Sequence, residues 1–425
     1  MNNIKENIKF SIAIIGLGYV GLPLLVEFSK KIKCIGFDTN SERVLQLKKG
    51  IDQTGECNLS VDNSLRLTSN LNDLKDCNIF IITVPTPVTK NKVPDFSYLI
   101  KASEAVGSCL KKNDIVIYES TVSPGATEEI CIPILVKSSN LIFNTDFFCG
   151  YSPERINPGD KLRTLTNIKK ITSGSNPDTA DRIDWLYNQI ITAGTYRASS
   201  IKVAEMAKII ENTQRDINIA LINEISIICN KLKIDTTEVL LAAETKWNFI
   251  SFRPGLVGGH CIGVDSCYLT NKSFEIGYIP ELITAARKVN DGMSTYVANN
   301  LIKIMCNKGI QISSSNILIL GITFKENCKD IRNSRVPEIY DELISFGAMV
   351  DIYDPQAEVE ATYREYKINL NKDLKNKKYD AVLVAVSHNE FQSLFSGKKP
   401  YFLKTIHVIY DIKSLLDKSI SDARL

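Results

Sequence analysis

The sequence predicts an α/β protein with two doubly wound domains, each a mainly parallel sheet covered by helices, joined by a long central helix. Three observations predict this fold. Apolar runs alternate with amphipathic stretches in the first third of the chain, a long stretch without proline or glycine follows in the middle, and the last third returns to the first pattern. Strands that alternate with helices form parallel sheets with both faces covered.

The first domain is predicted from its apolar runs, with strands at 11–15, 33–37, 78–84 and 115–118 and a helix at 19–30. The second strand ends at Asp38, the third is followed by prolines, and the fourth leads into a turn at 123–125. Such residues mark the ends of elements. We expect this domain to span residues 1–199.

The middle of the chain predicts helices. Residues 200–232 lack proline and glycine and carry apolar side chains at helical spacing. A helix of roughly 30 residues would be about 45 Å long, which is too long for one small domain. We therefore expect a spine between domains that also forms a homodimer surface. A second helix is expected at 279–305, after a glycine-rich loop, and the central region spans 200–305.

The last third repeats the opening pattern. Strands are predicted at 316–320, 348–353 and 380–386, and a helix at 334–346. We expect a second doubly wound domain over 306–425.

Composition excludes several classes of protein. The net charge is only +3, which argues against nucleic-acid binding through bulk positive charge. No apolar run approaches about 18 residues, so we expect no membrane association. The polar segment 1–10 predicts no secretory signal. Eleven scattered cysteines without a C-x-x-C pair predict free thiols in the cytoplasm, and with only three histidines we expect no metal site.

The segment from Gly16 to Gly21 reads G-x-G-x-x-G, directly after a predicted strand and at the start of a helix. In this context the motif predicts a Rossmann-type dinucleotide site, with pyrophosphate at the helix N-terminus. Asp38, at the end of the next strand, would bind the ribose hydroxyls and repel a 2′-phosphate, which favours NAD over NADP. Arg43 either lies over the adenosine ribose or is simply solvated. The expected cofactor contacts here are Gly16, Gly18, Tyr19, Val20, Gly21, Asp38 and Arg43.

The segment 255–265 places four glycines around Cys261. Glycines suit a backbone wrapped closely around a ligand, and a thiol at that place is a candidate covalent nucleophile; the alternative is a structural cysteine. Asp265 either holds a water or a lysine near the thiol or is a turn residue. His260 is expected to serve in backbone positioning rather than as a general base.

Lys208 and Asn212 lie one turn apart in the predicted long helix and share a face with Glu205 and Arg215. A lysine with an asparagine one turn away can stabilise a developing oxyanion. The alternative is a solvated polar face.

Taken together, these residues resemble the UDP-glucose/GDP-mannose dehydrogenase family over nearly the whole chain. The resemblance appears in ordered blocks: 16–21, V-P-T-P at 84–87, E-S-T-V at 119–122, Y-S-P-E-R-I-N-P-G at 151–159, Lys208 with Asn212, 258–265, and 321–327 with 330–334.

The resemblance implies oxidation of C6 of a nucleotide sugar from alcohol to carboxylate with two NAD per turnover. It implies that Cys261 captures the aldehyde as a thiohemiacetal, that the second oxidation gives a thioester, and that water assisted by Glu154 hydrolyses it. The implied roles are oxyanion stabilisation by Lys208, Asn212 and a water held by Asp265, with Thr121 bound to that water and to the cofactor. Further implied contacts are Thr86 and Arg332 to NAD, and Glu154, Arg155, Lys208, Asn212, Arg253, Gly258 and Lys325 to the UDP-sugar.

Within the family, G-G-H-C-I-x-V-D together with S-P-E-R-I-N-P-G is similar to the branch that acts on UDP-N-acetylhexosamines, UDP-GlcNAc or UDP-GalNAc, for capsule or O-antigen synthesis. Members acting on UDP-glucose carry F-L-R-E or F-L-A-E where this chain has 155–158. Ser266 departs from the branch, which has proline after the aspartate, and this affects the expected turn rather than the nucleophile.

Two alternatives remain besides a related substrate such as UDP-glucose or GDP-mannose. A two-electron dehydrogenase with a structural Cys261 would yield one NADH per sugar. A catalytically silent nucleotide-sugar scaffold would have no need of Cys261, Lys208, Asn212, Glu154 and Asp265 together.

Overall fold

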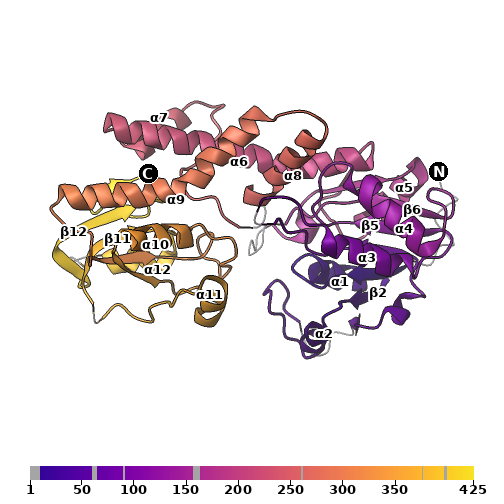
Figure 1. Ribbon diagram of the computed structural model, residues 1–425. Coiled ribbons are helices and arrows are strands. Elements are labelled where there is room, and N and C mark those ends of the chain that lie inside the picture. The colour runs from indigo at the N-terminus through magenta and orange to yellow at the C-terminus, as the bar shows by residue number, and fades with distance from the viewer. Residues whose placement is uncertain are drawn as a thin grey trace. The chain divides into compact units, whose positions relative to one another are not determined.

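The computed structural model describes residues 10–425 except 60–64, 90, 157–162, 260–261, 376 and 397–399. The chain forms two compact units (Figure 1). Unit 1 is the described part of Met1–Glu211 with Cys267–Ile276, and unit 2 is the described part of Asn212–Ser266 with Gly277–Leu425.

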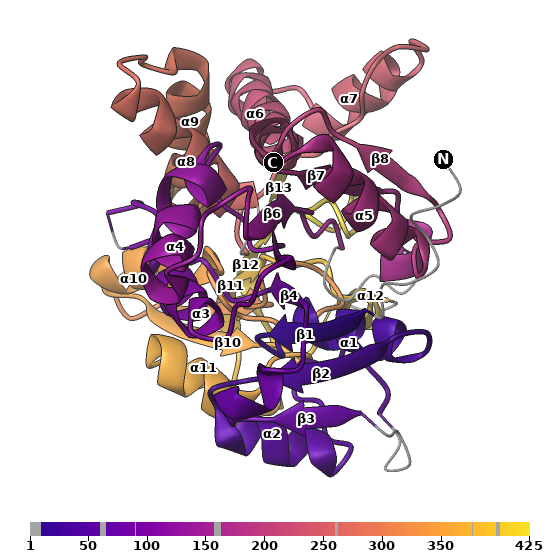
Figure 2. The same cartoon turned by 90° about the vertical axis from the view of Figure 1, so that its right-hand side faces the viewer.

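Unit 1 contains an eight-stranded sheet in the order β3-β2-β1-β4-β5-β6-β7-β8. Neighbouring strands pair in parallel except β6 and β7, which are antiparallel, and this reversal departs from the expected parallel pattern. The strands are β1 (Ser11–Ile15), β2 (Lys33–Phe37), β3 (Arg66–Thr68), β4 (Ile79–Ile82), β5 (Asp114–Tyr118), β6 (Phe147–Tyr151), β7 (Lys170–Gly174) and β8 (Thr195–Arg197). Figure 2 shows β1, β2 and β3 side by side, with the helix α2 (Ser41–Lys48) next to β3.

Helices cover both faces of this sheet because successive strand residues point to opposite sides. Ile12 and Ile14 pack with α1, α2 and α5, while Ala13 and Ile15 pack with α3, α4 and the first turns of α6 (Ile201–Leu232). The helical elements are α1 (Gly21–Ser29), α2 (Ser41–Lys48), η1 (Leu71–Leu74), α3 (Ser97–Gly107), the π-helical turn η2 (Thr127–Cys131), α4 (Ile132–Ser139), η3 (Leu165–Asn167) and α5 (Pro177–Asn188).

The middle of the chain is helical, as predicted, with α6 (Ile201–Leu232), α7 (Thr236–Glu244), α8 (Ile262–Glu275) and α9 (Glu281–Asn307). The long helix begins within one residue of its predicted start. The glycine-rich segment is shorter than predicted, because α8 begins at Ile262 and takes Gly263 and Asp265 into its first turn. Among the described residues, no helix has both the length and the apolar character needed to span a membrane.

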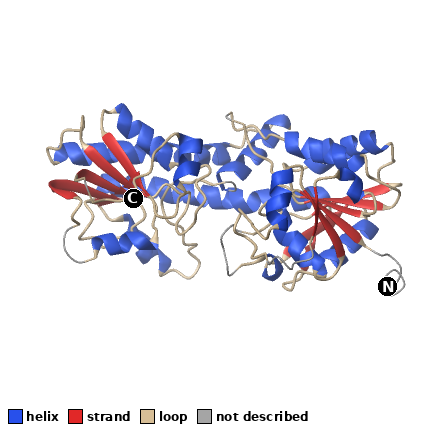
Figure 3. Cartoon of the chain, turned by 90° about the horizontal axis from the view of Figure 1, so that it is seen from below, coloured by secondary structure: helices blue, strands red, loops and turns tan. Residues whose placement is uncertain are grey.

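Unit 2 contains a parallel five-stranded sheet in the order β10-β9-β11-β12-β13. Ile317 and Ile319 pack with α9 and α10 on one face, and Leu318 packs with α12 on the other. Figure 3 shows helices on both sides of each sheet. The elements are β9 (Asn316–Leu320), α10 (Val336–Ser345), β10 (Met349–Tyr353), α11 (Val359–Tyr366), β11 (Tyr379–Val384), α12 (Asn389–Phe395), β12 (Leu403–Asp411) and β13 (Ala423–Arg424).

Each sheet reverses its strand order once, between β1 and β4 in unit 1 and between β9 and β11 in unit 2. In open α/β sheets, ligands bind beyond the carboxyl ends of the strands at such a point. The predicted cofactor loop follows β1, and the segment 321–327 follows β9. The fold therefore places both segments where each sheet can bind a ligand.

Candidate active site

The loop after β1 has the geometry of a dinucleotide site. Gly16 has a φ of +94°, which favours glycine, and a Cβ on Gly21 would lie 1.9 Å from the Gly16 carbonyl oxygen. A Cβ on Gly18 would have nothing within 4 Å. Gly16 and Gly21 are thus required by the fold itself, whereas Gly18 leaves open space beside the N-terminus of α1, where a phosphate is favoured.

Asp38 lies beside this loop and binds it. One carboxylate oxygen accepts from the Leu17 N–H at 2.9 Å and the other from the Asn40 N–H at 2.9 Å. Arg43 donates to the Leu17 carbonyl at 3.0 Å and to Asp52 at 2.8 Å, and its side chain is 11% exposed. Arg43 is therefore held against the loop, which does not fit a simply solvated arginine. Asp38, Gly18 and Arg43 line a cleft of about 400 Å³.

Thr86 and Thr121, both predicted to contact the cofactor, touch each other at the carboxyl edge of the same sheet. The Thr86 hydroxyl donates to the Thr121 carbonyl at 2.6 Å. The Tyr268 hydroxyl donates to the Thr86 carbonyl at 2.5 Å, which ties α8 to this loop. The loops after β4 and β5 are thereby joined.

Glu154 follows β6 and is 8% exposed. One oxygen accepts from the backbone N–H groups of Arg155 and Ile156 at 2.5 and 2.6 Å, and the other lies 3.4 Å from the Lys170 ammonium. The Arg155 side chain, predicted to bind substrate, forms an ion pair with Glu211 at 2.7 Å. The resemblance block 151–159 continues into residues 157–159, which lie outside the described residues.

Lys208 is only 7% exposed, which does not fit the alternative of a solvated polar face. Glu205, on the same predicted face, is buried and accepts from the Gly125 N–H at 2.5 Å and from the Thr127 N–H at 3.0 Å. Burial raises the pKa of Glu205 to about 7, although those hydrogen bonds oppose the rise. Arg215 is exposed. The face is therefore buried at Glu205 and Lys208 and solvated further along the helix.

Asn212 and Asp265 are brought together in unit 2. The Asn212 amide donates to an Asp265 carboxylate oxygen at 2.6 Å, and Asp265 is 2% exposed. Asp265 lies in the first turn of α8, so its interpretation as a turn residue is wrong. Cys261 and His260 lie outside the described residues.

The glycine-rich segment is held by α6. Asn223, which is buried, accepts from the Gly255 N–H at 2.8 Å and donates to the Gly255 carbonyl at 3.0 Å. A Cβ on Gly258 would lie 2.6 Å from the Asn333 carbonyl oxygen. The close approach that requires glycine at 258 is thus to the chain itself. Arg253 forms an ion pair with Glu244.

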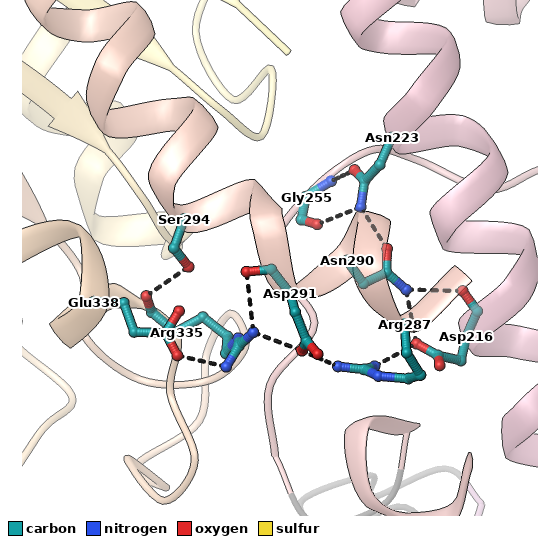
Figure 4. Close-up of polar contacts among 9 residues, drawn as sticks. All are labelled: Asp216, Asn223, Gly255, Arg287, Asn290, Asp291, Ser294, Arg335 and Glu338. Atoms are coloured by element: carbon teal, nitrogen blue, oxygen red, sulfur yellow. Dashed lines mark hydrogen bonds and ion pairs between the residues drawn. The ribbon is translucent and has the colours of Figure 1, made fainter. Parts of the chain in front are cut away.

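A polar network extends from Asn223 to the start of α10 (Figure 4). Asn223 donates to the Asn290 side chain at 2.8 Å, and Asn290 donates to Asp216 at 2.7 Å. Further members are Arg287, which binds Asp216 and Asp291, and Arg335, which binds Asp291 and Glu338. None of these residues was singled out from the sequence, since single polar residues within a helix give no signal of their partners.

In unit 2 the segment after β9 is fixed by His388. Its Nδ1 accepts from the Asn327 N–H at 2.9 Å, and its Nε2 lies 3.2 Å from the Asp354 carboxylate. Burial alone would raise the pKa of Asp354, but hydrogen bonds from His388 and the Ile322 N–H hold it below its usual value. The Lys325 ammonium lies 5.4 Å from the centre of the Phe324 ring.

Arg332, predicted to reach the NAD pyrophosphate, is 54% exposed and pairs with Asp330 at 2.7 Å. Its guanidinium donates to both carboxylate oxygens of Asp330, which lies in the same loop. Sequence reasoning missed Lys170, Asn223 and His388. Lys170 is the first residue of β7, and a charged residue at the end of a short strand gives no signal in the sequence that it is buried with a partner.

Two doubly wound domains, with a glycine loop of dinucleotide-site geometry at the switch point of the first sheet, define a dinucleotide-dependent oxidoreductase. The chain belongs to the UDP-glucose/GDP-mannose dehydrogenase family, whose NAD binding, central and UDP binding domain models match residues 10–191, 202–292 and 318–418. It is an NAD-dependent dehydrogenase, and NAD is its cofactor.

The chain is similar to several UDP-sugar dehydrogenases over nearly its whole length. It is 57% identical to the UDP-N-acetyl-D-glucosamine 6-dehydrogenase of Salmonella typhi, covering 98% of this chain and 99% of that protein. It is 55% identical to the Pseudomonas aeruginosa protein of the same name, and the match covers 97% of this chain and 99% of that protein. The structure of a UDP-D-ManNAc dehydrogenase from Pyrococcus horikoshii matches with a TM-score of 0.88 at 28% identity, over 98% of both chains.

Proposed function

We propose that the protein oxidises the C6 hydroxyl of a UDP-N-acetylhexosamine, UDP-GlcNAc or UDP-GalNAc, to the uronic acid, and so supplies a precursor for capsule or O-antigen. The identities of 57% and 55% to UDP-N-acetyl-D-glucosamine 6-dehydrogenases support this substrate class. The structural observation that carries the chemistry is the hydrogen bond from Asn212 to Asp265, with Lys208 one turn away on α6.

The proposed mechanism uses this chain's residues to capture and hydrolyse the oxidised carbon. NAD, when bound, accepts a hydride in each of the two oxidations. The Cys261 thiolate forms a bond to the aldehyde carbon while the π pair of the carbonyl moves to its oxygen, because an aldehyde must be captured or hydrated before a second hydride can leave. In the last step a water forms the new C–O bond, its proton passes to Glu154, and the C–S bond breaks to release the Cys261 thiolate.

Oxyanion stabilisation is proposed for Lys208 and Asn212, since a buried ammonium and an amide are fixed donors in a site of low dielectric. Asp265 would hold a water at this place, with Thr121 bound to it. Cofactor contacts are proposed for Gly16, Gly18, Tyr19, Val20, Gly21, Asp38, Arg43, Thr86, Thr121 and Arg332. Substrate contacts are proposed for Glu154, Arg155, Lys208, Asn212, Arg253, Gly258 and Lys325.

We also propose that the protein is a cytoplasmic homodimer. We propose three domains in each subunit, at residues 1–199, 200–305 and 306–425. Exposed apolar side chains along α6 support a subunit interface there: Val203, Met206, Ile210, Leu221 and Ile228 are between 42% and 54% exposed. Isolated exposed apolar residues are ordinary, but a series along one helix indicates a contact.

The test is the number of NADH molecules formed per sugar consumed. Purified protein is given NAD with UDP-GlcNAc, UDP-GalNAc, UDP-glucose or GDP-mannose in turn. Two NADH per N-acetylhexosamine are expected. One NADH per sugar would indicate a two-electron enzyme with a structural Cys261, activity on UDP-glucose alone would overturn the substrate class, and binding without turnover would indicate a scaffold.

A further inference from the structure

A buried cation lies between two carboxylates at the carboxyl edge of the unit 1 sheet. The Lys170 ammonium donates to Glu119 at 2.6 Å and to Glu154 at 3.4 Å. Lys170 and Glu119 are each 2% exposed. Glu119 also accepts from the Tyr187 hydroxyl, and the Lys170 ammonium lies 5.5 Å from the centre of the Tyr187 ring.

The reversed strand β7 brings this cation to the edge. Because β7 runs antiparallel to β6, with Tyr151 opposite Ser173, the first residue of β7 lies where β6 ends. The Ser173 hydroxyl donates to the Tyr151 carbonyl at 2.7 Å, and the Ser152 hydroxyl donates to the Ile171 carbonyl at 2.7 Å. A parallel β7 would have placed Lys170 at the opposite edge, away from Glu154.

The charges within this cluster depend on each other. Burial alone would lower the pKa of Lys170, but the two carboxylates raise it above its ordinary value. Burial raises the pKa of Glu119 to about 7, with Lys170 opposing the rise and Glu154 adding to it. The side chain of Arg155, the next residue in the sequence, forms an ion pair with Glu211 instead. Lys170 is therefore the cation whose charge stabilises two buried carboxylates at once.

We propose that Lys170 is a positioning residue for Glu154. Glu119 competes with Glu154 for the Lys170 ammonium and so weakens the ion pair between Lys170 and Glu154. The proposal rests on the proposed role of Glu154 in hydrolysis of the Cys261 thioester. Two N–H groups and one ammonium hold the Glu154 carboxylate in one orientation. An anionic carboxylate in a fixed place can take the proton of the attacking water.

Substitutions of Lys170 and of Glu119 have opposite expected effects. Lys170→Met leaves two carboxylates in a buried site, so one of them takes up a proton and the acid limb of the pH–rate profile moves to higher pH by about one unit or more. Glu119→Gln keeps the size of the side chain and an oxygen that accepts from Tyr187, but it removes one negative charge. Lys170 then pairs with Glu154 alone, and the acid limb of the profile moves to lower pH. Lys170→Arg keeps the positive charge and is expected to have the pH–rate profile of the wild type.

The experiment measures the burst and the steady rate of NADH formation in the full-length protein with NAD and UDP-GlcNAc. In Lys170→Met, the burst of two NADH per site is expected to persist, while the steady rate falls by about tenfold or more and acid quenching traps a sugar adduct on the protein. Leu186→Ala, a buried apolar change in α5, controls for lost stability and is expected to leave the profile in place.

The proposal fails if Glu119→Gln and Lys170→Arg both leave the profile where the wild type has it while Lys170→Met only lowers the amount of folded protein. It also fails if all three variants move the limb in the same direction. If the wild-type protein does not form two NADH per N-acetylhexosamine, the proposed function itself is wrong, which is a separate and visible outcome.

Discussion

Asn212 of α6 donates a hydrogen bond of 2.6 Å to Asp265 in the first turn of α8, a contact between residues 53 positions apart in the sequence. Asp265 is almost fully buried. The bond fixes the orientation of the Asn212 amide. Both residues were predicted to act on the same oxyanion, and within unit 2 the structure brings them into direct contact.

An exchange of these two side chains separates structural from catalytic roles. Asp265→Asn is expected to lower kcat by about 10- to 100-fold, since one charged hydrogen-bond partner contributes about 1.5–3 kcal/mol. The double variant Asn212→Asp with Asp265→Asn restores an amide–carboxylate pair. We expect it to recover the thermal midpoint but not kcat, and recovery of both would show that the pair is purely structural.

The glycines of the cofactor loop offer a matched pair of substitutions. Gly18→Ala places a methyl group in open space, so the free energy of unfolding should be unchanged while KM for NAD rises by about tenfold, because the pyrophosphate needs that space. Gly21→Ala drives a methyl group against the Gly16 carbonyl and should destabilise the protein by about 1–3 kcal/mol. Chemical denaturation and initial rates measure both. An unchanged KM in Gly18→Ala would contradict the phosphate site.

Cys261→Ser is expected to abolish steady turnover and to leave NAD binding intact, because a hydroxyl is a far weaker nucleophile than a thiolate. Cys306→Ser is the control, since Cys306 is a free, exposed cysteine near the end of α9. Fluorescence titration with NADH and steady-state rates provide the readouts. Near-normal turnover in Cys261→Ser would rule out the thioester route.

The pH dependence of stability should carry the signature of Glu205. Burial raises its pKa in the folded protein to about 7 from an ordinary value of 4.5, so the folded state binds a proton that the unfolded state has lost. This stabilisation is complete below about pH 4.5 and disappears as pH rises through about 7, with a slope of at most about 1.4 kcal/mol per pH unit.

Glu205→Gln removes this titration and should flatten the fall in unfolding free energy between about pH 5 and pH 7 relative to the wild type. Glu104→Gln, at an exposed site on α3, should leave the wild-type slope in place. Urea denaturation at several pH values measures the difference. A Glu205→Gln curve parallel to the wild type would show that Glu205 does not titrate in this range.

Local pattern was enough to predict much of the fold. The strands at 11–15, 33–37 and 316–320 lie as predicted, because an apolar run between polar ends matches a strand buried on both faces. The short strands β3 and β8 were not predicted, since a few residues at a sheet edge carry too little apolar pattern. The helix α8 was missed because the glycines before it suggested a longer loop.

The sequence by itself determined the dinucleotide loop, the family and the identity of the candidate catalytic side chains, because these depend on residue type and on spacing along one strand or helix. Only the tertiary structure decided which side chains form buried ion pairs and hydrogen bonds with one another. The antiparallel direction of β7 places Lys170 between Glu119 and Glu154, and the start of α8 places Asp265 against Asn212. Such contacts depend on strand direction and helix phase across long separations, which no local pattern encodes.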